Sequence, residues 1–153
     1  MPAVLQDPDA ASAGHPVLNV LQMYFERADA VNFGRRVLFD RPEGVALRPV
    51  LQTYGLGDTY STPPTMQAVA QSLGLPAAGP IPGGANAWPP GMGLDLPVMN
   101  NLAVGPMRAT AALIEADPAG AYDGHFVLFR DAATNARALG FVASALRGAA
   151  VVR

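Results

Sequence analysis

The feature that most constrains the fold is a strand-like run followed at once by a glycine-rich turn and a proline-started helix. The run Pro49–Tyr54 is short, partly β-branched and bounded by proline and glycine, which is typical of a buried strand in a parallel sheet. Gly55–Asp58 forms the turn, and Thr62 is placed to cap a helix that begins with two prolines and ends at Gly74. A strand, a loop and a helix in this order predict an α/β fold.

The remaining segments continue this pattern along the chain. Apolar residues at helical spacing predict three more helices, at residues 16–27, at 29–38 behind an Asp29 cap, and from an Asp131 cap to a Gly148 stop. The first of these is expected to have one buried face. Two further strands are expected at residues 97–103 and 108–115, on either side of a Gly-Pro turn.

The domain organisation follows from where these patterns stop. Residues 1–16 are polar, have no helical or strand period, and are interpreted as a leader or linker. Residues 17–150 are interpreted as a single α/β domain. Within it, residues 76–93 contain ten glycines or prolines among eighteen positions, which predicts an excursion loop or lid.

Composition excludes several classes of function. Ten basic and twelve acidic residues give a net charge of -2, which provides no electrostatic attraction for nucleic acid or an anionic membrane. The chain has no cysteine, so disulfides, thiolate nucleophiles and iron–sulfur clusters are excluded, and no cofactor is expected. All ten basic residues are arginine, a bias typical of a GC-rich, bacterial coding sequence.

The sequence contains neither a membrane span nor an export signal. No apolar run approaches the roughly 18–20 residues that cross a bilayer, so a soluble chain is expected. The first residues lack the basic head and apolar stretch of a signal peptide, which leaves the compartment open.

Two residues stand out as candidates for chemistry. Asp58 follows a glycine pair at the carboxyl end of the first expected strand, where open α/β sheets place functional side chains. His125 lies in a loop after the last expected strand, whereas the other histidine, His15, lies in the leader. A carboxylate can hold an imidazole in the tautomer that acts as a base. The structural alternatives are an Asx-turn for Asp58 and an ordinary hydrogen-bonded loop histidine for His125.

The two candidate segments resemble a known family. Residues 48–74, a strand, Asp58, a proline-containing turn and a helix, resemble the acid-bearing segment of α/β-hydrolases. Residues 122–129, Tyr-Asp-Gly-His-Phe-Val-Leu-Phe, with the helix that follows, look like the histidine loop of the same family. The resemblance implies that Asp58 is the acid and His125 the general base of a Ser-His-Asp triad that hydrolyses carboxylic esters in an esterase or lipase-like enzyme.

The chain departs from the family at the nucleophile. It has no Gly-x-Ser-x-Gly elbow, and none of its four serines has glycines at the two elbow positions. Ser61 lies near Asp58, but an acid three residues away cannot take the serine proton as an imidazole does. We therefore expect the C-terminal portion of a hydrolase sheet, lacking the N-terminal strands and the elbow. Such a portion is expected to be inactive alone and to self-associate through an exposed sheet edge.

Other interpretations carry less weight. The main alternative is a non-catalytic α/β module for binding or assembly. A dinucleotide loop at Gly55 and Gly57 lacks its third glycine, a metal site at Asp58, Asp123 and His125 lacks ligand spacing, and Glu115 is a weak glycosidase candidate. Asp123 is an alternative residue to orient His125, but at a distance of two residues it is expected to cap its own turn. The aromatic and methionine side chains that are candidates to line an acyl pocket are Tyr24, Tyr54, Tyr60, Trp88 and Met92.

Overall fold

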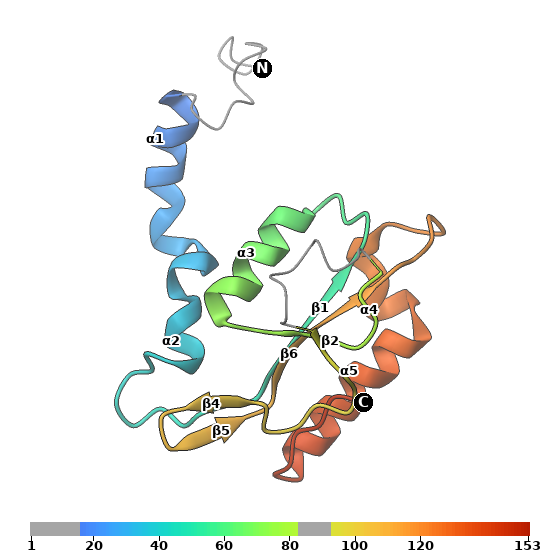
Figure 1. The fold of residues 1–153 in the computed structure, drawn as a ribbon. Helices are drawn as coiled ribbons and strands as arrows, with labels where there is room; N and C mark the ends of the chain where they lie inside the picture. Colours follow the sequence, from blue (N-terminus) through green and yellow to red (C-terminus); the bar gives the residue numbers. More distant parts are fainter. Residues whose placement is uncertain (1–15, 83–92) are drawn as a thin grey trace.

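The computed structural model describes residues 16–82 and 93–153, and it has helices on both faces of a parallel sheet (Figure 1). The α/β class expected from the sequence is therefore confirmed. The helices are α1 (Pro16–Phe25), α2 (Gly34–Leu38), α3 (Pro63–Leu73), α4 (Val127–Arg130) and α5 (Ala132–Leu146), with 3-10 turns η3 (Glu26–Ala28), η4 (Ala30–Phe33) and η6 (Gly124–Phe126). The strands are β1 (Val50–Gly55), β2 (Ala77–Ala78), β3 (Gly93–Leu94), β4 (Leu102–Val104), β5 (Met107–Ala109) and β6 (Ala111–Ala116).

The sheet brings the first and last strands together. In the described part of the chain its order is β1-β6-β2-β3, and each of these pairings is parallel. In the β1–β6 register, Tyr54 lies opposite Glu115 and Gly55 lies opposite Ala116. Both strands therefore end at the same edge of the sheet, and the loops that follow them begin side by side.

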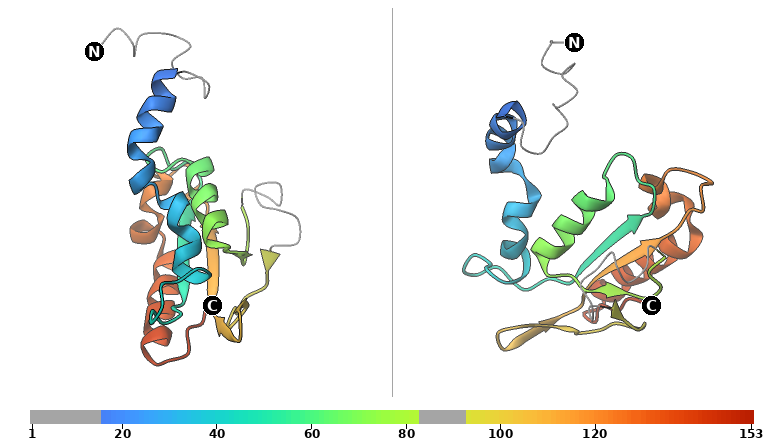
Figure 2. Two further views of the ribbon diagram at one scale, coloured as in Figure 1. Left: turned by 90° about the vertical axis from the view of Figure 1, so that its left-hand side faces the viewer. Right: turned by 45° about the horizontal axis from the view of Figure 1, so that its top comes forward.

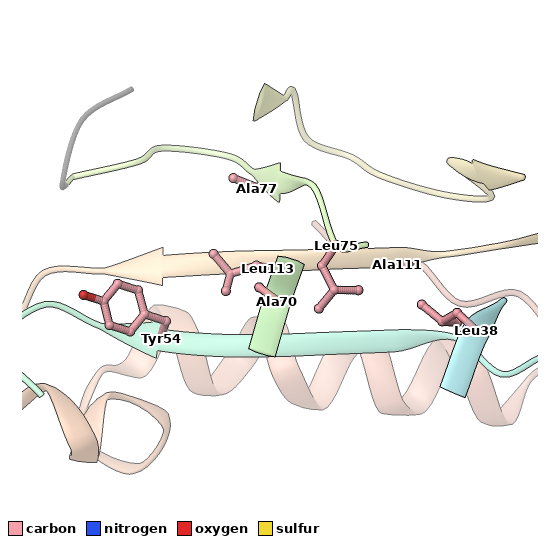
Figure 3. Packing of buried hydrophobic residues seen from close by; sticks show 7 residues of the cluster. All are labelled: Leu38, Tyr54, Ala70, Leu75, Ala77, Ala111 and Leu113. Carbon is pink, nitrogen blue, oxygen red and sulfur yellow. The ribbon is translucent and has the colours of Figure 1, made fainter. Parts of the chain in front are cut away.

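Alternation along β6 divides the core into two layers, because successive strand side chains point to opposite faces. Ala111 and Leu113 pack with Tyr54 against the face that α2 and α3 cover, as Figure 3 shows. Ala112 and Ile114 pack on the other face, in a cluster with Phe141 of α5. Figure 2 shows the sheet between α3 and α5.

Helix α1 forms where it was expected, but the expectation of a buried face is wrong. None of its residues is buried, and Tyr24 and Phe25 are 77% and 59% exposed. Figures 1 and 2 show α1 standing away from the sheet, beyond α2. The helical period predicts the conformation, but burial needs a second surface, which no described element supplies.

The expected helix ends are largely confirmed. Asp29 accepts a hydrogen bond from the Val31 amide (3.0 Å), and Asp131 accepts one from the Thr134 amide (2.6 Å). Gly74 ends α3 in the left-handed conformation, at a φ of 68°. Thr62 occupies the N-cap position of α3 but makes no capping bond to the backbone, because its hydroxyl pairs with that of Thr65.

The expectations for the strands after residue 96 need correction. Only the end of the expected strand at 97–103 is extended, in β4, and Val98 forms an isolated bridge to Val152. The expected strand at 108–115 is two strands, because the Gly105 turn closes a short β4–β5 hairpin before β6 enters the sheet. Thr110 separates them, and its hydroxyl donates to the carbonyl of Ala150.

The Gly/Pro-rich segment at residues 76–93 is not wholly a loop, since Ala77–Ala78 and Gly93–Leu94 pair as strands of the sheet. Residues 83–92 of this segment and residues 1–15 of the expected leader lie outside the described residues.

Candidate active site at the carboxyl edge of the sheet

Asp58 is held by the turn that ends β1. Gly57 has a φ of 70°, a conformation that favours glycine, and it turns the chain so that Asp58 is buried. One carboxylate oxygen, Oδ1, accepts hydrogen bonds from the amides of Tyr60 (2.8 Å) and Ser61 (2.7 Å). The Asx-turn alternative is thus present, but it uses only one of the two carboxylate oxygens.

The second oxygen of Asp58 faces His125. Asp58 Oδ2 lies 3.3 Å from His125 Nδ1, and the two residues are 67 positions apart in the sequence. The His125 side chain is 42% exposed, whereas that of Asp58 is 6% exposed. Water therefore reaches the imidazole ring, whereas the carboxylate is almost completely buried. The Asp58 and His125 side chains therefore lie together at one edge of the sheet.

The histidine side chain also lies among aromatic rings. Its ring centroid is 4.8 Å from that of Tyr60, which is tilted to it, and 5.3 Å from that of Phe126, which meets it edge-on. Tyr60 is 71% exposed and Phe126 is 38% exposed. These rings form an apolar rim on the solvent side of the Asp58–His125 pair.

The loops that carry the pair touch through two glycines, a contact that sequence reasoning missed. A Cβ built on Gly55 would lie 2.1 Å from the Gly124 carbonyl oxygen, and one built on Gly124 would lie 2.3 Å from the Leu56 carbonyl oxygen. No side chain fits at either position. The signal in the sequence was the presence of a glycine in each loop segment, Gly55 before Asp58 and Gly124 before His125.

Asp123 has a larger part in the site than the expected turn cap. It does cap η6, since Oδ1 accepts from the His125 amide at 2.9 Å. It also contacts Thr59 in the other loop, which sequence reasoning did not single out. These hydrogen bonds, that from the Thr59 hydroxyl above all, hold the pKa of Asp123 below its ordinary value of 3.8.

A small pocket opens beside the pair. It has a volume of about 210 Å³, and its lining includes the polar residues Asp58, Ser61 and His125 together with apolar residues such as Met66 and Phe129. A few polar groups among apolar side chains are typical of small-molecule sites.

Tyr54 and Glu115 lie behind this edge, on neighbouring strands. Burial, then the charges of Glu115 and Asp58, raise the pKa of Tyr54 above its ordinary value of 10.0. The phenol therefore stays neutral, and Glu115 is a buried residue of β6 beside Tyr54. Nothing in this position favours the glycosidase interpretation of Glu115.

No described serine is activated by His125. The backbone amide of Ser61 donates a hydrogen bond to Asp58. Among the described residues, the Ser61 hydroxyl makes no hydrogen bond to the imidazole of His125. The hydroxyls of Ser72 and Ser144 donate to carbonyls of their own helices, at Val69 and Phe141. Ser12 lies outside the described residues.

The other candidate groups do not assemble at this edge. Among the residues with described placement, no cluster of three or more histidine, aspartate or glutamate side chains is arranged to hold a metal ion. Of the side chains named as acyl-pocket candidates, Tyr60 lies at the pair, Tyr54 belongs to the core and Tyr24 is exposed on α1. Trp88 and Met92 fall outside the described residues.

The protein is therefore an α/β protein in which a buried carboxylate faces an accessible imidazole at the carboxyl edge of a parallel sheet. Comparisons of the chain with protein-family models, with curated proteins and with solved structures gave no match. None of the helices in the described part of the chain is both long and apolar enough to span a bilayer.

Proposed function

We propose that Asp58 and His125 are the acid and the general base of a serine hydrolase of the α/β-hydrolase class that cleaves carboxylic esters. The observation that carries the proposal is the 3.3 Å approach of Asp58 Oδ2 to His125 Nδ1, at the carboxyl ends of two adjacent parallel strands. The order of the two residues in the chain, acid before histidine, also agrees with that class.

In this mechanism the Nδ1–H group of His125 donates a hydrogen bond to Asp58 Oδ2, which fixes the tautomer that has Nε2 free to act as the base. The serine hydroxyl attacks the ester carbonyl carbon while Nε2 takes its proton. When the tetrahedral intermediate collapses, the ester C–O bond breaks and the imidazolium returns the proton to the leaving alkoxide. Water then attacks the acyl-enzyme by the same route and releases the acid. The two amides on Asp58 Oδ1 support the negative carboxylate throughout.

The serine would come from a segment outside this chain, and the end strand of the sheet is where such a segment would pair. Within the described residues β1 is paired on one side only, by β6. Unpaired backbone groups along a parallel strand are a template for another strand. A strand added there would lie beside Asp58, so a serine at its carboxyl end would approach His125.

The proposal is tested on the native gene product with a fluorophosphonate probe, which labels activated serines, followed by intact-mass measurement. We expect a species of about twice 15.9 kDa or more, with the adduct on a serine that precedes residue 1 of this chain. His125→Ala and Asp58→Asn in that protein should abolish labelling. His15→Ala and Asp117→Asn are the matched controls, and a 15.9 kDa species without an adduct would contradict the proposal.

A second candidate function is a non-catalytic assembly module. The observation that favours it is the exposed apolar surface of α1, where Val20 and Met23 are 66% and 71% exposed. Apolar patches of this kind mark interaction surfaces. Analytical ultracentrifugation of the 153-residue chain tests it. A concentration-dependent dimer that Val20→Ser with Met23→Ser converts to monomer would support this function, and a monomer at all concentrations would exclude self-assembly.

A further inference from the structure

A second carboxylate joins the two loops that carry Asp58 and His125. Asp123 Oδ2 accepts a hydrogen bond from the Thr59 hydroxyl at 2.6 Å. Asp123 Oδ1 accepts from two backbone amides, that of Thr59 at 3.3 Å and that of His125 at 2.9 Å. One side chain therefore holds the residue next to Asp58 and the backbone of His125 at the same time.

These bonds act at the place where the loops already touch. Gly55 and Gly124 let the two loop backbones come into van der Waals contact, and this contact sets how closely the loops approach. The glycine contact limits the distance but provides no directional bond to stop one loop from sliding past the other. The bonds to Asp123 provide that direction, because a carboxylate with three donors has few alternative orientations.

The alignment of the Asp58–His125 pair depends on this restraint. The separation of 3.3 Å between Oδ2 and Nδ1 is slightly beyond the usual 2.7–3.2 Å range of such hydrogen bonds. Solvent also reaches the imidazole, since the His125 side chain is 42% exposed. A long bond on an exposed ring is lost with a small shift of either loop.

We propose that Asp123 and Thr59 are positioning residues that clamp the acid loop onto the histidine loop and so keep His125 aligned on Asp58. The effect of this clamp on catalysis rests on the proposed function, whereas the hydrogen bonds that form the clamp are present in this chain whatever its function. The same hydrogen bonds lower the pKa of Asp123, which agrees with a carboxylate that accepts them in its ionised form.

The first test needs no serine and uses the 153-residue chain. A proton shared between an aspartate and a histidine Nδ1 gives a low-field proton NMR signal, which Asp58→Asn and His125→Ala would identify by its loss. In Thr59→Val and Asp123→Ala we expect this signal to broaden beyond detection, because the proton exchanges faster with water. Thr59→Ser keeps the hydroxyl and should retain the signal. A signal unchanged in both Thr59→Val and Asp123→Ala would overturn the proposal.

Amide hydrogen exchange separates positioning from a general loss of stability. The exchange rate of the His125 amide should rise about tenfold or more in Asp123→Ala, while that of the Leu113 amide, bonded within the core to Pro76, should not change. Asp117→Asn is the matched control, because Asp117 caps a turn in the same connection without touching Thr59. Equal acceleration at His125 and Leu113 would mean that Asp123 only stabilises the fold, and it too would overturn the proposal.

The second test uses the complete, serine-bearing protein. Thr59→Val should lower kcat for an ester about tenfold to a hundredfold with little change in KM, since a misaligned base slows chemistry rather than binding. Thr59→Ser should restore most of the rate, and a Thr59→Val enzyme with unchanged kcat would contradict the clamp. If the wild-type protein has no esterase activity while the NMR and exchange results hold, the proposed function fails and the clamp stands.

Discussion

Helices α1 and α5 have similar apolar spacing in the sequence but different surroundings in the structure. Helix α5 packs on the sheet and buries Phe141 to 8% exposure, whereas α1 buries none of its residues and leaves Phe25 59% exposed. The difference is that α5 contacts β1 and helix α4, whereas α1 extends beyond α2 (Figure 1). An amphipathic period therefore predicts that a helix forms, and the neighbouring surface decides whether its apolar face is buried.

The largest expected effect concerns activity and contrasts the sheet edge with the N-terminal region. In the complete protein, His125→Ala should lower kcat for an ester about 10³-fold or more, because it removes the only histidine among the described residues and with it the proposed base. His15→Ala should leave kcat unchanged. The measurement is steady-state ester hydrolysis. Retention of activity by His125→Ala would remove the catalytic distinction between the two regions.

The next effect tests the comparison between the helices directly, with one phenylalanine from each. Phe141→Ala should cost about 3 kcal/mol of unfolding free energy, because it leaves a cavity between α5 and the sheet. Phe25→Ala should change it by less than about 0.5 kcal/mol. Chemical denaturation of the 153-residue chain measures both. A comparable loss at Phe25 would mean that α1 is buried in solution, in an assembly or otherwise.

Two glycines, Gly124 in the loop contact and Gly140 in α5, allow the same substitution to be compared at a crowded and an open position. Gly124→Ala should cost about 3 kcal/mol, because the added methyl group would meet the backbone of Leu56, Gly55 and Asp58 within 2.7 Å. Gly140→Ala should stabilise the chain by about 0.5–1 kcal/mol, since it lies in α5 with open space around it. Thermal unfolding measures both variants. A Gly124→Ala protein as stable as the wild type would contradict the close contact of the two loops.

The smallest expected effect is at the start of α5. Asp131→Ala should cost about 1 kcal/mol, because it removes the cap of the Thr134 amide, whereas Asp131→Asn should keep most of it. The Thr134 hydroxyl and amide lower the pKa of Asp131 below 3.8. Its stabilisation is therefore complete above that value and disappears as the pH falls through the lowered pKa. The unfolding curves of wild type and Asp131→Ala should be separated at pH 7 and should converge at acid pH, and a gap that stays constant with pH would contradict this.

The candidate pair itself could be found from the sequence, but the residues that hold it could not. Asp58 and His125 each follow a recognisable strand, so their position at a sheet edge was predictable from local pattern. Thr59 and Asp123 are 64 residues apart, and nothing near either one in the chain indicates that they bond. The strand at residues 97–103 was misplaced because apolar runs with alanine and proline do not reveal which segment enters the sheet.

By itself, the sequence determined the α/β class, the strand–turn–helix unit around Asp58, the Asp29 and Asp131 caps and the two candidate side chains. These depend on interactions within a few residues, such as capping bonds, backbone preferences and apolar spacing. Only the tertiary structure decided that β6 lies beside β1, that Gly55 meets Gly124, and that α1 is left uncovered. Such contacts join distant segments, and they arise from how whole elements pack rather than from the preference of any one of them.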